Sequence, residues 1–205
     1  MMTHVLDLST RASASGGLAA LQGYLAQIVG EPFRFARISY GDELTLHFGD
    51  LKPARSAQLG NRKYGSYIFG TRGSTWKIDA GSSPLVYTAG SDSGSATDES
   101  GLRNVPKEEF ESTSPIRVGS RAVSATAFAV VPADGFALQL TLSDGSSFFI
   151  LLDRSDSDTS DAESDCLPEI ADWELASPRG LLSAWPGPRW TFEPSRKFDS
   201  GSPSA

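Results

Sequence analysis

Apolar and polar residues alternate in short segments along most of this chain, and that period of two constrains the fold more than any other feature. Leu44, Leu46 and Phe48 alternate with polar residues in one such segment. Successive side chains of a strand point to opposite faces of a sheet, so the alternation predicts strands with one buried face. The predicted strands of the first half cover 33–37, 44–48, 64–69, 75–78 and 85–88, with Phe33, Phe35 and Arg37 expected on one face of the first.

The second half predicts strands of the same kind. Segments 122–131, 137–142 and 147–152 are separated by tight turns, which predicts a three-stranded meander whose last strand is buried on both faces. Because 20 Gly and 12 Pro supply many turns, we predict a mainly β fold of antiparallel sheets. Shorter strands are predicted at 173–176, 181–184 and 189–192.

One N-terminal helix, predicted over 15–29, makes the fold α+β in the strict sense. Its apolar residues lie three and four apart, Ser15 is the expected N-cap, and Gly30 ends the segment. Gly23 costs about 1 kcal/mol relative to alanine in a helix interior, so we expect packing against a sheet to stabilise this helix. The apolar positions are Leu18, Leu21, Leu25 and Ile28.

Two stretches of the sequence align with each other. LTLHFGD, which begins at Leu44, matches LQLTLSD, which begins at Leu138. A tryptophan follows each stretch, Trp76 after 32 residues and Trp173 after 35. This pattern predicts an internal duplication of a β unit, with the two units forming a sandwich or an open barrel. The alternative is that any two amphipathic strands followed by a tryptophan align this well.

A single globular domain is predicted at 15–194, because a chain of 205 residues can bury one good core or at most two small ones. Whether the two repeats share one core stays open. The termini, 1–14 and 195–205, are predicted to be a flexible segment and a disordered tail. The repeats span 33–89 and 122–193, and polar loops are expected at 90–112 and 153–170.

Charge is distributed unevenly along the chain. The net charge of −7 and the pI near 4.8 oppose general binding to nucleic acid, whose phosphates would be repelled. Residues 51–78 nevertheless hold six basic and no acidic residues, whereas residues 153–174 hold nine acidic residues and one basic residue. Segments of opposite charge can steer and orient a binding partner.

The cellular location is predicted from what the sequence lacks. Cys166 is the only cysteine, so no internal disulfide can form, which suits a reducing compartment. The N-terminal residues have no basic block followed by an apolar block, and no apolar run approaches about 18 residues. We therefore expect a cytoplasmic protein without membrane insertion.

Signatures of catalysis are weak. No P-loop, dinucleotide-binding or G-x-S-x-G motif occurs, and His4 and His47 are the only histidines. His47 is predicted to point away from the apolar face of its strand, toward solvent or a neighbouring element, and we expect it to be a surface residue; in the alternative it is a general base close to Asp50. The acidic run lacks EF-hand spacing and Cys166 has no partners for a zinc site, so we predict no metal and no cofactor.

Two charged segments are the candidate binding surfaces. The acidic one is expected to contact a protein partner first. The basic one, within 52–77, interleaves cations with aromatic rings, a composition that suits base stacking, although its aromatic residues fit core-filling strand positions better. The candidate binding residues are Asp153, Asp156, Asp158, Asp161, Glu163, Asp165, Arg62, Lys63, Arg72, Trp76 and Lys77.

Near its C-terminus the sequence reads WELxxPxG and then PGPxW, between Trp173 and Trp190. This pattern resembles the C-terminal part of small β-rich bacterial proteins of unknown function. Some proteins of that type act as immunity or accessory partners of toxin or defence systems. The resemblance implies such a mode of action but assigns no functional residue.

Together these features predict a noncatalytic macromolecule-binding protein, an immunity, accessory or regulatory subunit that acts on a protein partner through charged loops. The alternative is an enzyme or nucleic-acid-processing protein that combines 52–77 with His47, with Arg72 or Lys77 holding an anionic substrate. A third alternative, an acidic mimic of DNA, is disfavoured because the acidic residues cluster in loops. The oligomeric state is left open.

Overall fold

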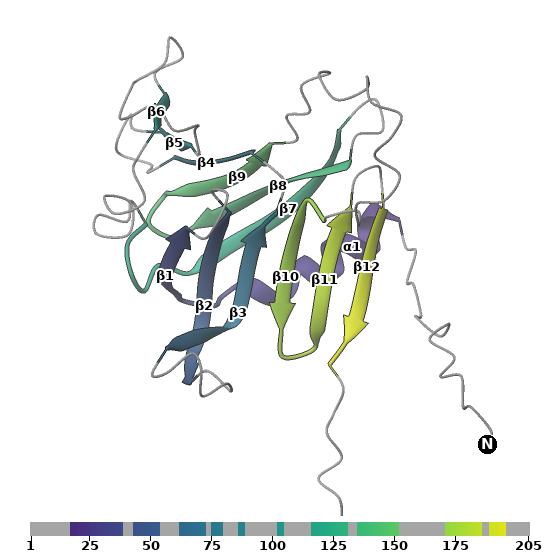
Figure 1. Ribbon diagram of the computed structural model, residues 1–205, viewed down its shortest axis with the longest axis horizontal. Helices are drawn as coiled ribbons and strands as arrows, with labels where there is room; N and C mark the ends of the chain where they lie inside the picture. The colour runs from purple at the N-terminus through teal and green to yellow at the C-terminus, as the bar shows by residue number, and fades with distance from the viewer. Residues whose placement is uncertain are drawn as a thin grey trace, which may run out of the picture.

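The computed structural model contains two six-stranded sheets that pack face to face, together with one short helix (Figure 1). The sheets are open at both edges and do not close into a barrel. The predicted mainly β fold with one N-terminal helix is therefore confirmed. The structure describes residues 17–38, 43–53, 62–72, 75–79, 86–88, 102–104, 116–130, 135–151, 171–185 and 189–195.

The first sheet has the strand order β1-β2-β3-β10-β11-β12, and all of its strand pairs are antiparallel. It forms the front layer of Figure 1. Each strand agrees with a segment predicted from the period of two. The bounds are β1 Phe33–Ile38, β2 Leu44–Pro53, β3 Lys63–Thr71, β10 Trp173–Ser177, β11 Gly180–Trp185 and β12 Arg189–Pro194.

The second sheet has the order β6-β5-β4-β9-β8-β7, and its pairs are antiparallel except for the parallel pair β5 and β6. Strand β6 lies inside the loop predicted at 90–112, since three residues are too short to show an alternating pattern. The bounds are β4 Thr75–Asp79, β5 Val86–Thr88, β6 Leu102–Asn104, β7 Ala122–Val130, β8 Gly135–Leu142 and β9 Ser147–Leu151.

The two halves of the chain exchange strands between the sheets. Strands β1–β3 lie in the first sheet and β4–β6 in the second, whereas β7–β9 lie in the second and β10–β12 in the first. As a result β3 pairs with β10, and β9 pairs with β4. Each sheet therefore consists of three strands from each half of the chain.

The register of the strands also repeats between the halves. Ile38 lies opposite Leu44 in the first half, and Ala127 lies opposite Leu138 in the second. One extra residue bulges at the same place in each edge strand, between Phe33 and Phe35 in β1 and between Ala122 and Ser124 in β7. Two residues that occupy the same place in this repeated register, one in each half, are called corresponding positions below. Leu44 and Leu138, which were aligned from the sequence, are one such pair.

The two tryptophans aligned from the sequence also occupy corresponding positions. Trp173 of β10 lies opposite Thr71 of β3, and Trp76 of β4 lies opposite Ile150 of β9. Thr71 and Ile150 themselves correspond, because the ladders that join them to β2 and β8 match. Both indole rings are fully buried.

The halves meet in a short ladder just before β1 and β7. Phe33 N–H donates to the carbonyl of Ser120 at 2.7 Å, and Ala122 N–H donates to the carbonyl of Glu31 at 3.1 Å. The two bonds are reciprocal, as a local two-fold axis between the halves requires. The turns that lead into this ladder place Gly30 at φ 89 and the corresponding Gly119 at φ 91.

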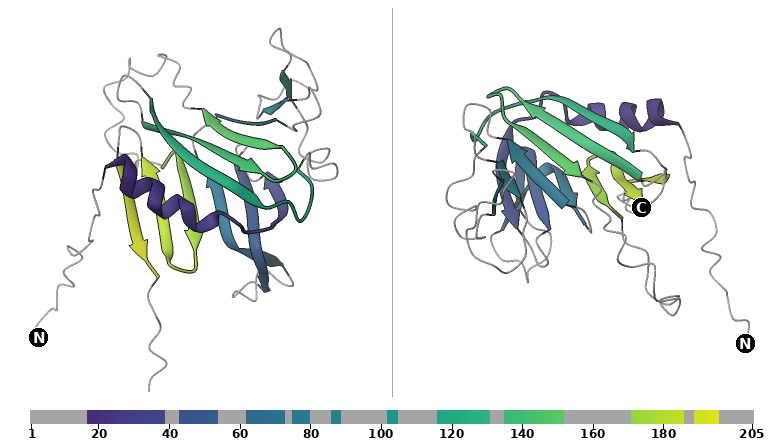
Figure 2. Two further views of the ribbon diagram at one scale, coloured as in Figure 1. Left: turned by 180° about the vertical axis from the view of Figure 1, so that it is seen from behind. Right: turned by 90° about the horizontal axis from the view of Figure 1, so that it is seen from above.

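Helix α1, Leu18–Leu25, continues as a 3-10 turn over Ala26–Ile28 and lies behind the first sheet, beside β7 (Figure 2). Its Tyr24 ring stacks on Phe192 of β12 at 4.2 Å, as the predicted packing against a sheet requires. The N-cap is Gly17, so the expected cap at Ser15 is wrong. In the described part of the chain, no helix is long and apolar enough to cross a membrane.

A single hydrophobic cluster lies between the sheets and takes residues from both halves and from α1. Phe69 and the corresponding Phe148 make an edge contact with ring centroids 5.6 Å apart. Trp173 donates from Nε1 to the carbonyl of Phe136 at 2.7 Å, which links β10 of the first sheet to β8 of the second. The described halves therefore share one core.

Candidate functional site

The outer face of the first sheet is the candidate functional site. No described helix or strand lies over this face, which points toward the viewer in Figure 1. The bulge at Arg34 turns Phe35 and Arg37 outward, while Ala36 and Ile38 point into the core. The expectation that Phe33, Phe35 and Arg37 share one face is therefore wrong, because an inserted residue reverses the alternation.

His47, predicted at the surface, is instead buried, with 2% of the residue exposed. Its ring stacks on Phe35 with centroids 4.2 Å apart and contacts Tyr64 at 5.7 Å. The N–H of Gly65 donates to His47 Nδ1 at 3.3 Å. These neighbours come from β1 and β3, so the strand's own alternation could not reveal the burial.

The electrostatics of His47 argue against a catalytic base. Burial, assisted by the positive charge of Arg37, lowers the pKa of His47 from 6.5 to about 4, so the ring is neutral at neutral pH. Nδ1 accepts the Gly65 N–H and is therefore the unprotonated nitrogen, and its lone pair is already used. Asp50 is exposed, and no hydrogen bond joins it to His47 among the described contacts. The geometry does not support the catalytic pair His47 and Asp50.

Arg37 completes a compact cluster with the aromatic rings. Its guanidinium carbon lies 4.8 Å from the centroid of Phe35 and 5.9 Å from that of Tyr64. Such cation–aromatic contacts hold an arginine against the surface without neutralising it. Within the described residues, no carboxylate pairs with Arg37. We call Phe35, Arg37, His47 and Tyr64 the outer cluster.

Basic residues lie at the end of the β2–β3 hairpin, next to the outer cluster. Lys52 lies directly opposite Tyr64, and cross-strand neighbours share one face, so this lysine extends the cluster along the hairpin. Arg62 and Lys63 follow at the hairpin end and are exposed. Of the predicted binding residues, Arg62 and Lys63 are therefore the two that lie near the outer cluster.

The other candidate binding residues of the basic segment, Arg72, Trp76 and Lys77, are not part of the outer cluster. Arg72 forms ion pairs with Glu43 and Glu174, each at 3.1 Å. Trp76 is 1% exposed in the core, which corrects its assignment as a binding residue and matches the core-filling interpretation. Lys77 lies on β4 of the other sheet, over the ring of Phe149 at 4.9 Å.

The predicted acidic binding residues, Asp153, Asp156, Asp158, Asp161, Glu163 and Asp165, and the thiol of Cys166 lie outside the described residues. Of the acidic residues between 153 and 172, the structure describes Asp172, which is 6% exposed. Its carbonyl accepts the N–H of Arg72 at 2.9 Å.

Corresponding positions on the second sheet carry different side chains. Where β1 and β2 of the first sheet present Phe35, Arg37 and His47, the strands β7 and β8 present small polar residues. The second outer face has its own cation–aromatic pair, Lys77 over Phe149, at positions that correspond to Glu174 and Gly70. The outer cluster is thus a property of one face. Its counterparts of Phe35, Arg37 and His47 are Ser124, Thr126 and Thr141.

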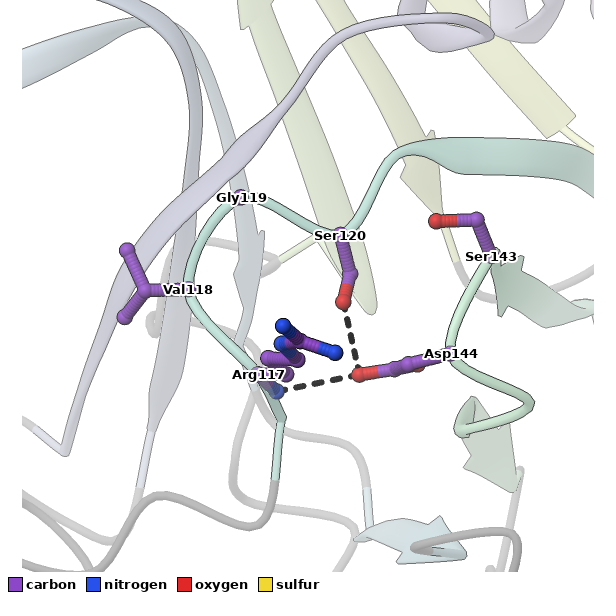
Figure 3. A pocket seen from close by; sticks show the side chains of 6 residues that line it. All are labelled: Arg117, Val118, Gly119, Ser120, Ser143 and Asp144. Atoms are coloured by element: carbon purple, nitrogen blue, oxygen red, sulfur yellow. Dashed lines mark hydrogen bonds between the residues drawn. The ribbon is translucent and has the colours of Figure 1, made fainter.

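A polar pocket of about 300 Å³ lies at the corner where the halves meet, lined by the turn 117–120 and by Ser143 and Asp144 (Figure 3). Asp144 accepts hydrogen bonds there from Ser120 Oγ at 2.7 Å and from Arg117 N–H at 3.0 Å. Its other oxygen accepts from the N–H and the hydroxyl of Ser146. Burial raises the pKa of Asp144, but these hydrogen bonds outweigh it and lower the pKa below 3.8. The Asp144 carboxylate therefore links the turn 117–120 to Ser146 by hydrogen bonds.

Metal ligands do not gather in the described ranges, where no group of three or more His, Cys, Asp and Glu side chains lies close enough to hold an ion. Comparison with protein-family models, with curated proteins and with solved structures finds no match for this chain.

Phe35 and Arg37 were not singled out from the sequence as binding residues. The signal that could have identified them is the change of parity after Arg34, where Ala36 and Ile38 take over the apolar positions. The sequence indicates Tyr64 only as an aromatic residue of the basic segment, because its contact with His47 depends on the pairing of β2 with β3.

Proposed function

We propose that this chain is a noncatalytic binding protein that engages another protein as an immunity or accessory subunit, in the cytoplasm. The observation that supports this proposal is the outer cluster. Phe35 and Arg37 are partly exposed on a sheet face that no described element covers, and their counterparts Ser124 and Thr126 show that the scaffold does not require them. Aromatic residues and arginine are the side chains most enriched where proteins bind each other.

The partner is expected to present carboxylates. Arg37 has no described carboxylate partner, and Lys52, Arg62 and Lys63 extend its positive charge along the hairpin. A carboxylate on a partner can pair with a guanidinium that already lies on aromatic rings without ordering a long, mobile side chain. A protein is favoured over nucleic acid because the chain carries a net charge of −7, which repels a continuous phosphate backbone.

An internal duplication is part of the proposal. The repeated register, the matching bulges and the corresponding tryptophans support an origin from one β unit that was copied and then intertwined. After such an event the inward residues stay constrained by the core, while one outer face is free to acquire a binding surface. The acidic segment around Asp158 is proposed as a second contact with the partner.

Affinity purification from the native source tests this function. Wild-type chain is compared with the double variant Phe35→Ser, Arg37→Thr, which installs the side chains of the corresponding positions. The matched control is Ser124→Ala, Thr126→Ala on the other outer face. We expect wild type and the control variant to retain one protein that the double variant loses. Binding of this protein to wild type should weaken as the salt concentration rises.

Two results would contradict the proposal. One is a set of bound proteins that is identical for wild type and for the Phe35 and Arg37 double variant. The other is binding that disappears after nuclease treatment, which would assign the outer cluster to nucleic acid instead.

A further inference from the structure

The two edge strands β1 and β7 occupy corresponding places but are protected differently. On β7, the amide of Gln22 from helix α1 donates from Nε2 to the carbonyl of Ala125. Its Oε1 accepts the N–H of Ala127 at 3.1 Å. One side-chain amide thus occupies the place of a residue in a neighbouring strand, and the edge of β7 is capped there.

The same backbone groups of β1 point away from its sheet. Ala36 and Ile38 correspond to Ala125 and Ala127, and in an antiparallel ladder alternate residues direct their N–H and C=O away from the partner strand. In the described part of the chain, no helix places a side-chain amide against these groups of Ala36 and Ile38. Their backbone N–H and C=O groups form no hydrogen bond to a described residue outside the sheet. Within the described part of the chain, the β1 edge between Arg34 and Ile38 is therefore an unpaired strand edge.

We propose that this edge binds an extended acidic segment of the partner protein as an added strand. The proposal rests on the proposed binding function and identifies the kind of segment that is recognised. Pairing along an exposed edge supplies backbone hydrogen bonds, and the alternate side chains supply selectivity.

Residues of β1 define which side chains the added strand carries. Phe35 and Arg37 are two residues apart on the same outer face, so two residues of the added strand lie beside them, also two apart. An apolar side chain suits the position beside Phe35, and a carboxylate suits the position beside Arg37. Arg34 adds positive charge at the start of the edge, where its Nε donates to the carbonyl of Gly49 at 2.7 Å.

The available edge is short. At its beginning Phe33 is already paired, since its carbonyl accepts the N–H of Gly119 at 2.8 Å and its N–H donates to Ser120. Only Ala36 and Ile38 offer free amide and carbonyl pairs, so a peptide alone is expected to bind weakly, with a dissociation constant on the order of micromolar or higher.

A labelled peptide of about eight residues tests the proposal, with threonine on one face and alternating valine and glutamate on the other. Binding to the full chain is measured by fluorescence anisotropy at low ionic strength. We expect saturable binding of this peptide and at least about tenfold weaker binding of the peptide in which lysine replaces glutamate. The variant Arg37→Glu should reverse that preference, while Thr126→Glu, the matched control at the corresponding position of β7, should leave it unchanged.

Strand addition is separated from simple charge attraction by methylating peptide nitrogens. Two peptides carry N-methyl groups on complementary sets of alternate residues, so that one set faces the β1 edge and the other faces solvent. We expect one methylated peptide to bind as the parent does and the other to lose binding. Equal binding of both methylated peptides, or no preference for glutamate over lysine, overturns the proposal.

The failure of this inference can be told apart from failure of the binding function. A captured protein that depends on Phe35 and Arg37, together with peptides that do not bind, would retain the function and discard strand addition. Peptides that bind as expected, without any captured protein that depends on the outer cluster, would retain the edge site and discard the proposed function.

Discussion

The two sheets of this protein share one register, over β1–β3 with β10 in the first and over β7–β9 with β4 in the second, but present different outer faces. On the inward side the corresponding residues are buried, and several are identical, as in Leu46 and Leu140 or Trp76 and Trp173. On the outward side His47 of the first sheet corresponds to Thr141 of the second. Since both faces are compatible with the same register, the aromatic and charged residues of the outer cluster are not needed to form the sheet. They are the residues on which the proposed binding function rests.

The largest expected effect tests whether the inward sides are equivalent. Replacing either Trp76 or Trp173 by alanine removes a fully buried indole from the shared core, at a cost of about 3 to 5 kcal/mol in the free energy of unfolding. Because the core is continuous, each variant should unfold in one cooperative transition. Urea unfolding followed by circular dichroism measures both quantities.

Phenylalanine variants cover the case in which an alanine variant does not fold. Trp173→Phe leaves the carbonyl of Phe136 without its indole donor, which costs about 1 to 3 kcal/mol beyond the lost contacts. Two separate transitions in any of these variants, one for each half of the chain, would refute the shared core.

The next largest effect is the pH dependence of the free energy of unfolding, to which His47 contributes on the first outer face and Thr141 cannot contribute on the second. The pKa of His47 is lowered to about 4 in the folded protein, whereas an unfolded histidine takes up its proton near pH 6.5. The unfolded state therefore binds more protons between these values, and stability is complete above pH 6.5 and falls as the pH drops toward 4. The loss amounts to at most about 3 kcal/mol.

His47→Thr, which installs the residue found at the corresponding Thr141, should abolish this loss between pH 6.5 and 4. The Asp144 carboxylate acts in a different window, because its lowered pKa means that its contribution is lost only as the pH falls below 3.8. Chemical denaturation at a series of pH values separates the two. An unchanged slope in His47→Thr would show that the histidine is not desolvated as the structure has it.

Most of the fold could be predicted from the sequence because strand formation is local. The alternation around Leu44 and Leu138 predicts both hairpins, and their alignment agrees with the register of the structure. The exchange of strands between sheets could not be predicted, since the pairing of β3 with β10 joins residues about a hundred positions apart and leaves no local pattern.

The candidate site could be predicted only in part, because its residues depend on pairing. Arg62 and Lys63 follow from the charge pattern, since exposed cations at a hairpin end need no tertiary partner. The alternation within its own strand predicts His47 at the surface, whereas Phe35 and Tyr64 from the neighbouring strands bury it. The single extra residue at Arg34 decides that Phe35 faces outward.

A smaller effect compares the two turns at the local two-fold axis. Gly30 and Gly119 have φ near +90, a conformation that costs a residue with a side chain about 1 kcal/mol or more. A Cβ added at either glycine meets no atom within 4 Å, so the backbone term alone should act. Gly30→Ala and Gly119→Ala are therefore expected to destabilise the protein equally, by about 1 to 2 kcal/mol. Thermal unfolding of the two variants checks this. A clearly larger destabilisation by one of the two substitutions would show that the turns are not equivalent.

The smallest effect concerns the ion pairs of Arg72, which belong to the first sheet but lie outside the outer cluster. Arg72 bridges Glu43 and Glu174, but 45% of its side chain is exposed, so solvent and salt screen both pairs. Arg72→Ala should therefore lower the free energy of unfolding by less than about 1 kcal/mol, and the difference should vanish at high salt. At the position corresponding to Glu174 the second sheet has Lys77, whose contact with Phe149 should respond less to salt. Unfolding of Arg72→Ala and Lys77→Ala at low and high ionic strength measures this contrast, and equal salt dependence would show that the two faces do not differ in how their charges are held.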